Sequence, residues 1–559
     1  MTATKRNPIQ VDELNGVEIV SQRDRHTKVF DLGCGRRQAV IFTEPVHFRS
    51  ADGAWREIDN TLEETTVNGA SVFRNHANDA VMTFDRLRGD ASLSRDGRTF
   101  RWKLLGAQDA VPVVHTGAQL RSAALNLMTR AEAAARTTAK ALRGDVSEKL
   151  ISRLDFANLR PGVSVRYTLG GTQMKQDILL DNAEAVKDAA LLLPKTFRYQ
   201  VAEDMHVDVL DPETDELLFV FESPETYDAK GAATLAVVTL AETEDGVILR
   251  YSLPEAFLSE AAFPVTIDPV VRTATTDAVV SDAYIWKKRP SNNYGNVHLM
   301  RCGLGEGGES IALVKFEKLV KIRASDTILS AQLCMHEQNY GNDKEYMGCY
   351  PIKTAWTEYG VTWNNMTPAN TDHISGDMIA YVTGTTGFRY FDITALYRTW
   401  YLKDANGVSR NNGVAIRFPA GISSSNNYVE WTGAKNNVSG SPRMYVTYVS
   451  HAGRQDWWQY ESMSCGRAGS AYVDLYNGNL VYEHADGATV GARMPVAIKH
   501  VYNSCLSESN PVSCGNGWRT SMHQQVSRQA IDSTNYYVWL DGGATEHYFP
   551  ISGSQPYKD

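Results

Sequence analysis

The segment from Trp356 to Pro368 constrains the fold of this chain more than any other stretch of the sequence. It reads Trp-Thr-Glu-Tyr-Gly-Val-Thr-Trp-Asn-Asn-Met-Thr-Pro, so tryptophans, one acidic residue and amide-rich turn residues lie between strand-like segments. A companion segment, Ser291–Asn296, lies upstream and is followed by the strand-like run Ile311–Phe316. Aromatic residues among short strands and tight turns are typical of a β-sandwich. Neither segment contains a set of groups that could carry out bond chemistry.

The length and composition predict a mainly β, multi-domain protein. A chain of 559 residues exceeds the roughly 250–300 residues at which single cores stop growing. Its hydrophobic fraction of 43% and charged fraction of 22% are those of folded globular domains. The content of 26 tyrosines, 11 tryptophans and 42 glycines favours many short strands joined by tight turns.

Charge and hydropathy argue against several classes of partner. The net charge of −9 includes no basic stripe, so we expect no nucleic-acid partner. The longest apolar runs, such as Leu191–Leu193, are far too short to span a bilayer, and no transmembrane segment is predicted. Residues Met1–Pro8 lack the apolar core of a secretory signal, so the sequence displays no export signal.

We predict a β-rich first region over residues 1–272. Apolar and polar residues alternate through its first strand-like pieces, and Asp52-Gly53 predicts a hairpin turn. A short helical insertion is expected near 118–156, because apolar residues there recur at helical spacing and Asp145 can cap a second helical piece from Val146 to Leu154. We interpret it as an insertion packed against a sheet; the alternative is an amphipathic helix that binds a partner.

Two further regions follow the proline and threonine residues after residue 268. Residues 273–450 are predicted to form a jelly-roll-like β-sandwich in the middle of the chain. Residues 451–559 are predicted to be a linker and the start of another β structure, because Tyr472–Leu480 reads as strand, Asn-Gly turn and strand.

Several of these motifs resemble known bacterial families. Ser291–Asn296 and Trp356–Pro368 resemble the DNRLRE domain of bacterial surface and secreted proteins, a module related to carbohydrate-binding modules. Pro45–Leu62 is similar to the N-terminal region of Rhs-type and wall-associated proteins. Gly515–Arg519 and Asp541–Phe549 resemble the start of an Rhs/YD-repeat shell.

The resemblance implies a secreted or cell-wall-associated scaffold. It also implies that the chain is the truncated front of a longer protein, with downstream Rhs repeats and a C-terminal toxin or effector as its partners. The central module would then bind cell-wall or extracellular polysaccharide. The alternative is a spacer or plug for a toxin-enclosing β-shell that binds no glycan.

A candidate carbohydrate-binding site lies at the start of the central region. Sugar sites combine flat aromatic rings with polar side chains at their edges, and Tyr284, Trp286, Tyr294 and Arg301 supply both. Strand alternation places Tyr284 and Trp286 on one face and Ile285 on the other. If Ile285 lies in the core, the two aromatic residues point outward. The alternative is that they fill the sandwich or a seam between domains, and the Asn-Tyr-Gly setting of Tyr294 favours a structural turn.

The sequence predicts no catalytic residues. It contains no G-x-S-x-G, H-E-x-x-H or Walker motif. Glu358 is the best acidic candidate for a polysaccharide-active enzyme, which is the less favoured alternative. We expect it instead to brace strands by accepting hydrogen bonds from buried backbone amides.

Cysteines and histidines suggest no metal site. The seven cysteines form no CxxC pair, and the thirteen histidines are scattered. Cys505 and Cys514 flank a short polar loop and could form a disulfide after export; the alternative is that the cysteines are scattered small apolar residues. Calcium in an exposed loop stays possible, but no residues are assigned to it and no other cofactor is expected.

Overall fold

A computed structural model describes most of the chain and confirms a mainly β, multi-domain protein. The described residues are 17–33, 36–120, 148–230, 232–274, 279–297, 299–305, 308–322, 326–340, 346–367, 372–383, 387–401, 409–419, 427–435, 440–449, 454, 459–475, 478–491, 496–504, 514–515, 517–531, 534–543 and 545–551. No helix in this described part is long and apolar enough to cross a membrane.

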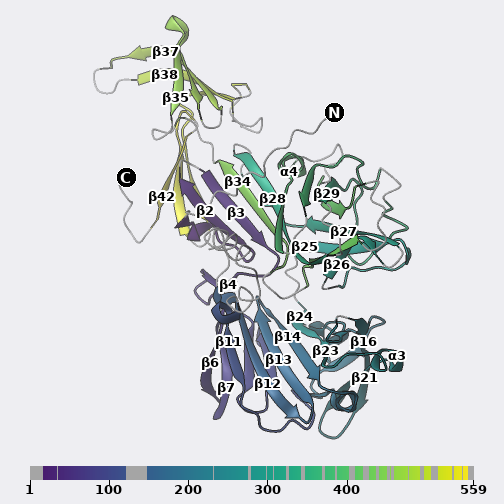
Figure 1. The fold of residues 1–559 in the computed structure, drawn as a ribbon. Coiled ribbons are helices and arrows are strands. Elements are labelled where there is room, and N and C mark those ends of the chain that lie inside the picture. Colours follow the sequence, from purple (N-terminus) through teal and green to yellow (C-terminus); the bar gives the residue numbers. More distant parts are fainter. Residues whose placement is uncertain are drawn as a thin grey trace.

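The N-terminal domain consists of two sheets packed face to face (Figure 1). In spatial order the first sheet contains β21 (Val237–Glu242), β22 (Val247–Ser252), β15 (Ala190–Leu193), β10 (Arg98–Leu104), β9 (Ala91–Arg95), β8 (Val81–Asp85), β7 (Ala70–Ala77) and β6 (Asp59–Val67). The second contains β11 (Val113–Thr116), β12 (Ile151–Arg160), β13 (Val163–Gly170), β14 (Gln173–Leu180), β24 (Val270–Thr273), β18 (Leu217–Phe221), β17 (Val207–Leu210) and β16 (Arg198–Val201). Beside this order, β23 (Val265–Asp268) pairs with β14 and with β19 (Glu225–Tyr227), and β19 pairs with β20 (Ala233–Leu235). The domain also contains three short helices, η2 (Glu148–Leu150), η3 (Ala183–Asp188) and α3 (Glu255–Leu258).

Strand alternation builds the core of this domain. In β10, Phe100 and Trp102 are buried, whereas Arg101 and Lys103 are exposed. Phe100 stacks on Trp102 from its own strand and on Phe219 from the opposite sheet, with both pairs of ring centroids 5.4 Å apart. Burying each such ring stabilises the fold by about 1.5–3 kcal/mol.

The predicted helical insertion is only partly visible. Residues 117–120 are helical, and 121–147 lie outside the described residues. The prediction of a helix to Leu154 is wrong, because Ile151 begins β12. Leu154 and Phe156 are buried on one face of that strand, so burial follows a period of two there and overrides the local helical spacing.

The central module is the predicted β-sandwich. One face contains β26 (Leu299–Gly305), β33 (Asn427–Thr432), β28 (Thr327–Tyr340), β31 (Gly387–Asp392) and β34 (Arg443–Val449). The other contains β25 (Val280–Trp286), β27 (Gly308–Phe316), β32 (Val414–Arg417), β29 (Tyr346–Pro351) and β30 (Ala380–Thr383), and β27 pairs with β26 as well as with β25 and β32. Between the faces lies one hydrophobic core, to which α4 (Thr394–Trp400) contributes Tyr397 and Trp400.

The first strands of the chain complete this central sheet. β1 (Val17–Glu18), β2 (Thr27–Gly33) and β3 (Arg36–Phe42) extend it beyond β34. β3 pairs with β34 from Arg36 opposite Val449 to Phe42 opposite Arg443. A segment of the predicted first region therefore lies in the sheet of the predicted second region, as the purple strands beside β34 show (Figure 1).

A small connector joins the N-terminal domain to the central module. It contains η1 (Val20–Gln22), β4 (His47–Arg49) and β5 (Trp55–Glu57). Phe42, Val46 and Ile58 pack there against Tyr445 of the module and Leu150 of the N-terminal domain.

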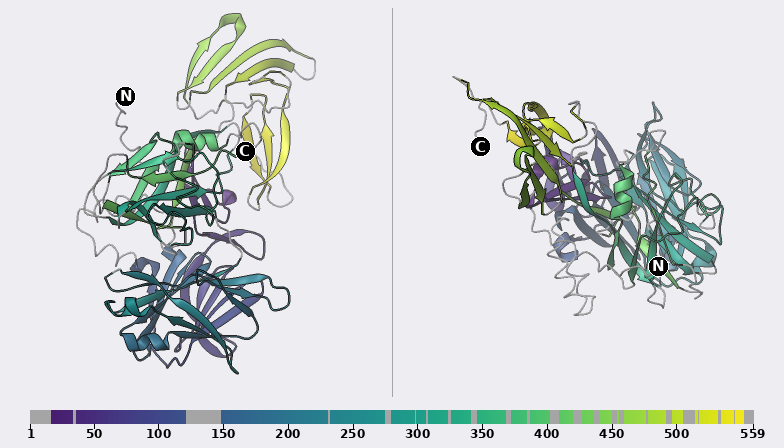
Figure 2. Two further views of the ribbon diagram at one scale, coloured as in Figure 1. Left: turned by 90° about the vertical axis from the view of Figure 1, so that its right-hand side faces the viewer. Right: turned by 90° about the horizontal axis from the view of Figure 1, so that it is seen from above.

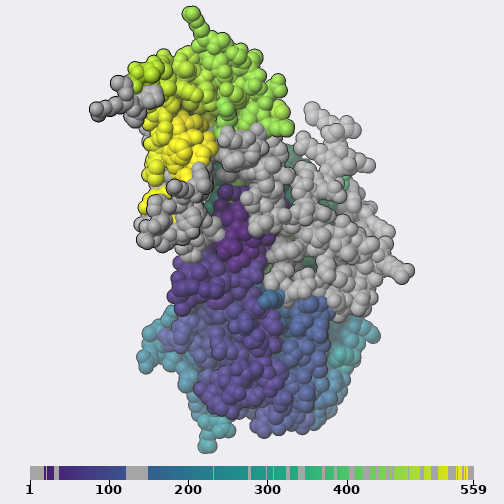
Figure 3. Space-filling view, turned by 90° about the vertical axis from the view of Figure 1, so that its left-hand side faces the viewer, coloured from purple at the N-terminus to yellow at the C-terminus, as the bar shows by residue number. Residues whose placement is uncertain are grey.

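The C-terminal strands form two separate small sheets. The first has the order β35 (Tyr460–Ser464), β36 (Ser470–Asp474), β37 (Leu480–Thr489), β38 (Val496–Asn503) and β39 (Trp518–Thr520), with η4 (Gly466–Ala468) between β35 and β36. The second contains β40 (Gln525–Ile531), β41 (Thr534–Leu540) and β42 (Glu546–Pro550). The first lies at one end of the molecule and the second lies beside the central module (Figure 2, left). In space-filling view these green-yellow and yellow segments cap the end opposite the N-terminal domain (Figure 3).

Candidate functional site

The two motifs that predicted the sandwich interlock in the structure. The side-chain amide of Asn293 donates hydrogen bonds to the carbonyl oxygens of Glu358 at 2.8 Å and Val361 at 2.7 Å. Gly295 packs directly on the Glu358 carbonyl, because a Cβ at this position would lie 2.2 Å from that oxygen. Ser291–Asn296 and the described part of the second motif, Trp356–Thr367, are therefore two halves of one clasp.

The clasp covers the outer face of one sheet. Trp356 and Trp363 are 7% and 9% exposed and belong to a core cluster with Ile285 and Ile311. The Trp356 indole Nε1 donates to the carbonyl oxygen of Asn412 at 2.9 Å. These tryptophans hold a loop on the sheet and offer no flat surface to a ligand.

Glu358 braces strands, as the sequence predicted. Its carboxylate accepts a hydrogen bond from the backbone N–H of Asp282 at 3.0 Å and lies 2.7 Å from the Lys435 ammonium. Burial raises the pKa of Glu358 to about 7, and the positive charge of Lys435 opposes that rise. The Glu358 Oε1 atom therefore joins β25 to the segment that follows β33.

The predicted aromatic residues do not point freely into solvent. Ile285 is fully buried beneath the clasp, and Tyr284 packs on the opposite face against the sandwich core. Trp286 is 7% exposed, so the expectation that it points outward is wrong. The reason is that both faces of β25 are covered, one by the clasp and the other by the second sheet and Tyr294.

Tyr284, Trp286 and Tyr294 form one aromatic cluster. Tyr284 and Tyr294 stack with ring centroids 4.3 Å apart and planes 17° apart, and Tyr294 meets Trp286 edge-on at 6.3 Å. The Arg289 guanidinium carbon lies 5.9 Å from the centre of the Trp286 ring. Burial raises the pKa of Tyr294, and the nearby Arg289 and Arg301 oppose that rise. The structure thus brings Arg301 next to the cluster, and all four predicted residues lie together.

Strand β33 supplies neighbours that the sequence did not indicate. Arg301 of β26 lies opposite Glu430 of β33, with guanidinium and carboxylate 3.3 Å apart. The Arg301 guanidinium carbon also lies 4.9 Å from the centre of the Tyr428 ring. Alternation in Tyr-Val-Glu puts Tyr428 and Glu430 on one face, but only the pairing of β26 with β33 brings them to Arg301.

The cysteine prediction stays open. Cys514 is partly buried, whereas Cys505 lies outside the described residues. Cys302, Cys334 and Cys349 are buried in the central module, and burial raises the pKa of Cys302 to about 12. These three behave as small apolar core residues.

One group of potential metal ligands occurs among the described residues. Oxygen and nitrogen atoms of Glu18, His47 and Glu57 lie within 4.8 Å of one another. Arg23 donates two hydrogen bonds of 2.7 Å to Glu18, and Lys28 forms an ion pair with Glu57. Two fixed cations already neutralise these carboxylates, so the group fits an ion-pair cluster that ties β1 and β2 to β4 and β5, and it does not fit a cation site.

Comparison with known families assigns two segments. Residues 273–411 match the family described as carbohydrate-binding module family 96 (CBM96). Residues 471–549 match DUF6531, a domain of unknown function. The predicted relation of the central region to carbohydrate-binding modules is thereby confirmed.

Similarity to individual proteins is low. The chain is 20% identical over 414 residues to the tRNA(Glu)-specific nuclease WapA of Bacillus subtilis subsp. natto (strain BEST195) and to the tRNA nuclease WapA of Bacillus subtilis (strain 168). Each alignment covers 70% of this chain and 16% of the relative, so the chain spans about a sixth of their length. Among solved structures, the GH31 alpha-xylosidase from Xanthomonas citri aligns at 9% identity over 78% of this chain and 38% of that chain, but its TM-score of 0.08 supports no likeness of fold.

Proposed function

We propose that this chain is a non-catalytic scaffold and adhesion portion of a secreted or cell-wall-associated protein, and that its central module binds polysaccharide. The observation that carries the proposal is the match of residues 273–411 to a carbohydrate-binding module family. The partner would be a cell-wall or extracellular polysaccharide.

We assign the sugar contact to the surface around the aromatic cluster. Tyr284 and Tyr294 are partly exposed, and Arg289 is exposed beside them. Stacked rings with a rim of guanidinium and carboxylate groups suit a sugar ring, which has an apolar face and hydroxyl edges. In this arrangement Trp286 packs edge-on against Tyr294 and holds its ring in place, and Arg301 and Glu430 bind hydroxyl groups of the sugar.

The wider architecture is also a proposal. The DUF6531 match and the long WapA relatives support a place for this chain in a larger Rhs-repeat protein, ahead of a β-shell and a C-terminal effector. In that setting the chain would anchor a delivery scaffold at the cell surface.

Polysaccharide binding is tested with the full 559-residue chain on a polysaccharide array and in affinity gels. We expect binding that falls at least about tenfold in Tyr294→Ala and in Arg301→Ala, because stacking and charge-assisted hydrogen bonds contribute roughly 1–3 kcal/mol each. Tyr381→Ala is the matched control, since Tyr381 is a 47% exposed tyrosine on β30 of the same module. An array with no binding would reject the proposal and favour a spacer or plug. Turnover of a polysaccharide that Glu358→Gln abolishes would make the chain an enzyme.

A further inference from the structure

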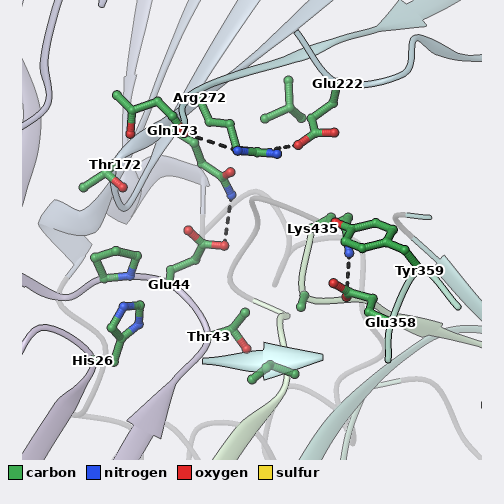
Figure 4. A pocket seen from close by; sticks show the side chains of 15 residues that line it. His26, Thr43, Glu44, Thr172, Gln173, Glu222, Arg272, Glu358, Tyr359 and Lys435 are labelled. Carbon is green, nitrogen blue, oxygen red and sulfur yellow. Dashed lines mark hydrogen bonds and ion pairs between the residues drawn. The ribbon is translucent and has the colours of Figure 1, made fainter. Parts of the chain in front are cut away.

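A cavity lies where the N-terminal domain, the connector and the central module meet (Figure 4). Water-sized molecules can occupy about 120 Å³ of it, which is room for several waters or one small molecule. Its polar lining comes from all three parts of the chain: Thr172, Gln173, Glu222 and Arg272 of the N-terminal domain, His26, Thr43 and Glu44 of the connector region, and Glu358, Tyr359 and Lys435 of the module.

Two of its carboxylates are already neutralised by cations. Arg272 of β24 forms an ion pair with Glu222 across one wall. On the opposite wall Lys435 lies 2.7 Å from Glu358 and 3.7 Å from Asp282. Both cations are held by ion pairs, so neither is available to a third carboxylate in the cavity.

Glu44 is that third carboxylate, and among the described residues it has no cationic partner. It follows β3 and reaches into the cavity, where its carboxylate accepts one hydrogen bond, at 2.9 Å, from the side-chain amide of Gln173 (Figure 4). Burial between the N-terminal domain and the central module raises its pKa to about 8. Burial thus favours the neutral form of Glu44, and a positive charge placed beside it stabilises the charged carboxylate.

We propose that the cavity binds a small organic cation, specifically an amine-bearing polyol such as an amino sugar, with its ammonium group at Glu44. Glu44 has no cationic partner among the described residues, so a ligand with one positive charge would complement it. The hydroxyl groups of Thr43 and Thr172 and the amide of Gln173 supply hydrogen-bond partners for a polyol. Tyr359, which is 62% exposed, presents an aromatic ring at the rim.

The chemistry of the lining disfavours a metal ion. Calcium takes six to eight oxygen ligands, and magnesium requires near-octahedral oxygen geometry. The described lining offers a single carboxylate that is not already ion-paired, because Arg272 and Lys435 hold Glu222 and Glu358 in ion pairs. A monovalent ammonium group with neighbouring hydroxyls meets these constraints, whereas a divalent ion does not.

This site is separate from the proposed polysaccharide surface. It needs residues of the N-terminal domain, and it shares none of its lining with the aromatic cluster. Loss of glycan binding at Tyr294 would leave it intact, and its own failure would leave the glycan proposal intact.

Calorimetric titration of the full chain with glucosamine, glucose and calcium chloride tests the inference. We expect glucosamine to bind at least about tenfold more tightly than glucose, and Glu44→Gln to remove that difference. Gln keeps the size of Glu and an oxygen that can accept the hydrogen bond from Gln173, so this variant should fold, and a thermal melt verifies that it does. Glu63→Gln is the matched control, because Glu63 is an exposed glutamate on β6 that does not line the cavity.

The outcomes separate clearly. Equal binding of glucosamine and glucose, or full glucosamine affinity in Glu44→Gln, would overturn the assignment. Tight calcium binding that Glu44→Gln abolishes would also overturn it, by making the cavity a metal site. Tyr359→Ala serves as a second variant that should fold normally, and a severalfold loss of glucosamine affinity is expected from it.

Discussion

At the residue scale, buried side-chain amides and closely packed glycines hold together segments that are distant in the sequence. Asn60 is fully buried; its side chain donates to the carbonyl oxygens of Leu150 and Gly171 at 3.0 Å each and accepts hydrogen bonds from Asn75 and Asn78. In the clasp, the side chain of Asn293 likewise donates to two backbone carbonyl oxygens, those of Glu358 and Val361. These side chains are hard to replace because they donate to backbone carbonyl oxygens, and leaving a buried partner without its hydrogen bond costs about 1–3 kcal/mol.

Gly295 offers the sharpest test at this scale. Gly295→Ala should destabilise the central module by several kcal/mol in a thermal or denaturant melt, because the new Cβ would lie 2.2 Å from the Glu358 carbonyl oxygen and would force the clasp open. Gly376→Ala is the matched control, since no atom lies within 4 Å of a Cβ built there. Equal stability of the two variants would show that the clasp does not hold the loop on the sheet.

At the scale of elements, the sequence predicted what local patterns determine and missed what pairing determines. Alternation identified β25 and placed Tyr284 and Ile285 on opposite faces, which the structure confirms. It could not tell that both faces would be covered, because the clasp and the second sheet arrive from elsewhere in the chain. For the same reason the helical prediction at Leu154 was wrong, since the burial of β12 against the N-terminal core is a tertiary effect.

The pairing of β3 with β34 was equally hidden from the sequence. Register between strands far apart in the sequence has no local signal, so nothing in Arg36–Phe42 indicates its partner Arg443–Val449. The candidate site shows the same limit: Arg301 was predicted, but its neighbours Tyr428 and Glu430 follow only from the pairing of β26 with β33.

Removal of residues 1–42 tests the role of these first strands. The truncated chain should aggregate and melt at a lower temperature, because β34 would become an open sheet edge and the apolar side chains of β3 would leave the core. Size-exclusion chromatography with light scattering and a thermal melt measure both effects. A chain lacking only residues 1–16 retains β1 to β3 and is the control. A monomeric truncation with an unchanged melt would show that the module is complete without β1 to β3.

At the scale of the whole molecule, the N-terminal domain is fixed to the central module at both of its ends. The chain leaves the central module after β3, builds the N-terminal domain, and returns to the module at β25. Ion pairs reinforce the junction: Arg25 lies 2.7 Å from Asp79 of the domain, and Lys318 of the module lies 2.8 Å from Asp24. This double attachment holds the cavity at Glu44 in one shape, because its walls belong to parts that cannot separate by turning about a single linker.

The C-terminal strands differ from the N-terminal domain in how they attach to the central module. Among the described residues, β35 to β42 pair only with one another and contribute no residue to the four hydrophobic core clusters. Large apolar side chains there remain in solvent, with Met463 64% and Leu475 60% exposed.

We therefore expect a chain that ends at residue 450 to keep the melting temperature of the N-terminal domain and central module within about 2 °C, since only losses above roughly 0.5–1 kcal/mol would shift it further. Differential scanning calorimetry of the full and shortened chains measures this, and the shortened chain should also retain glucosamine and polysaccharide binding. A large drop in melting temperature would mean that β35 to β42 stabilise the central module through contacts beyond strand pairing, and the region from 451 onward would then be part of one cooperative unit with it.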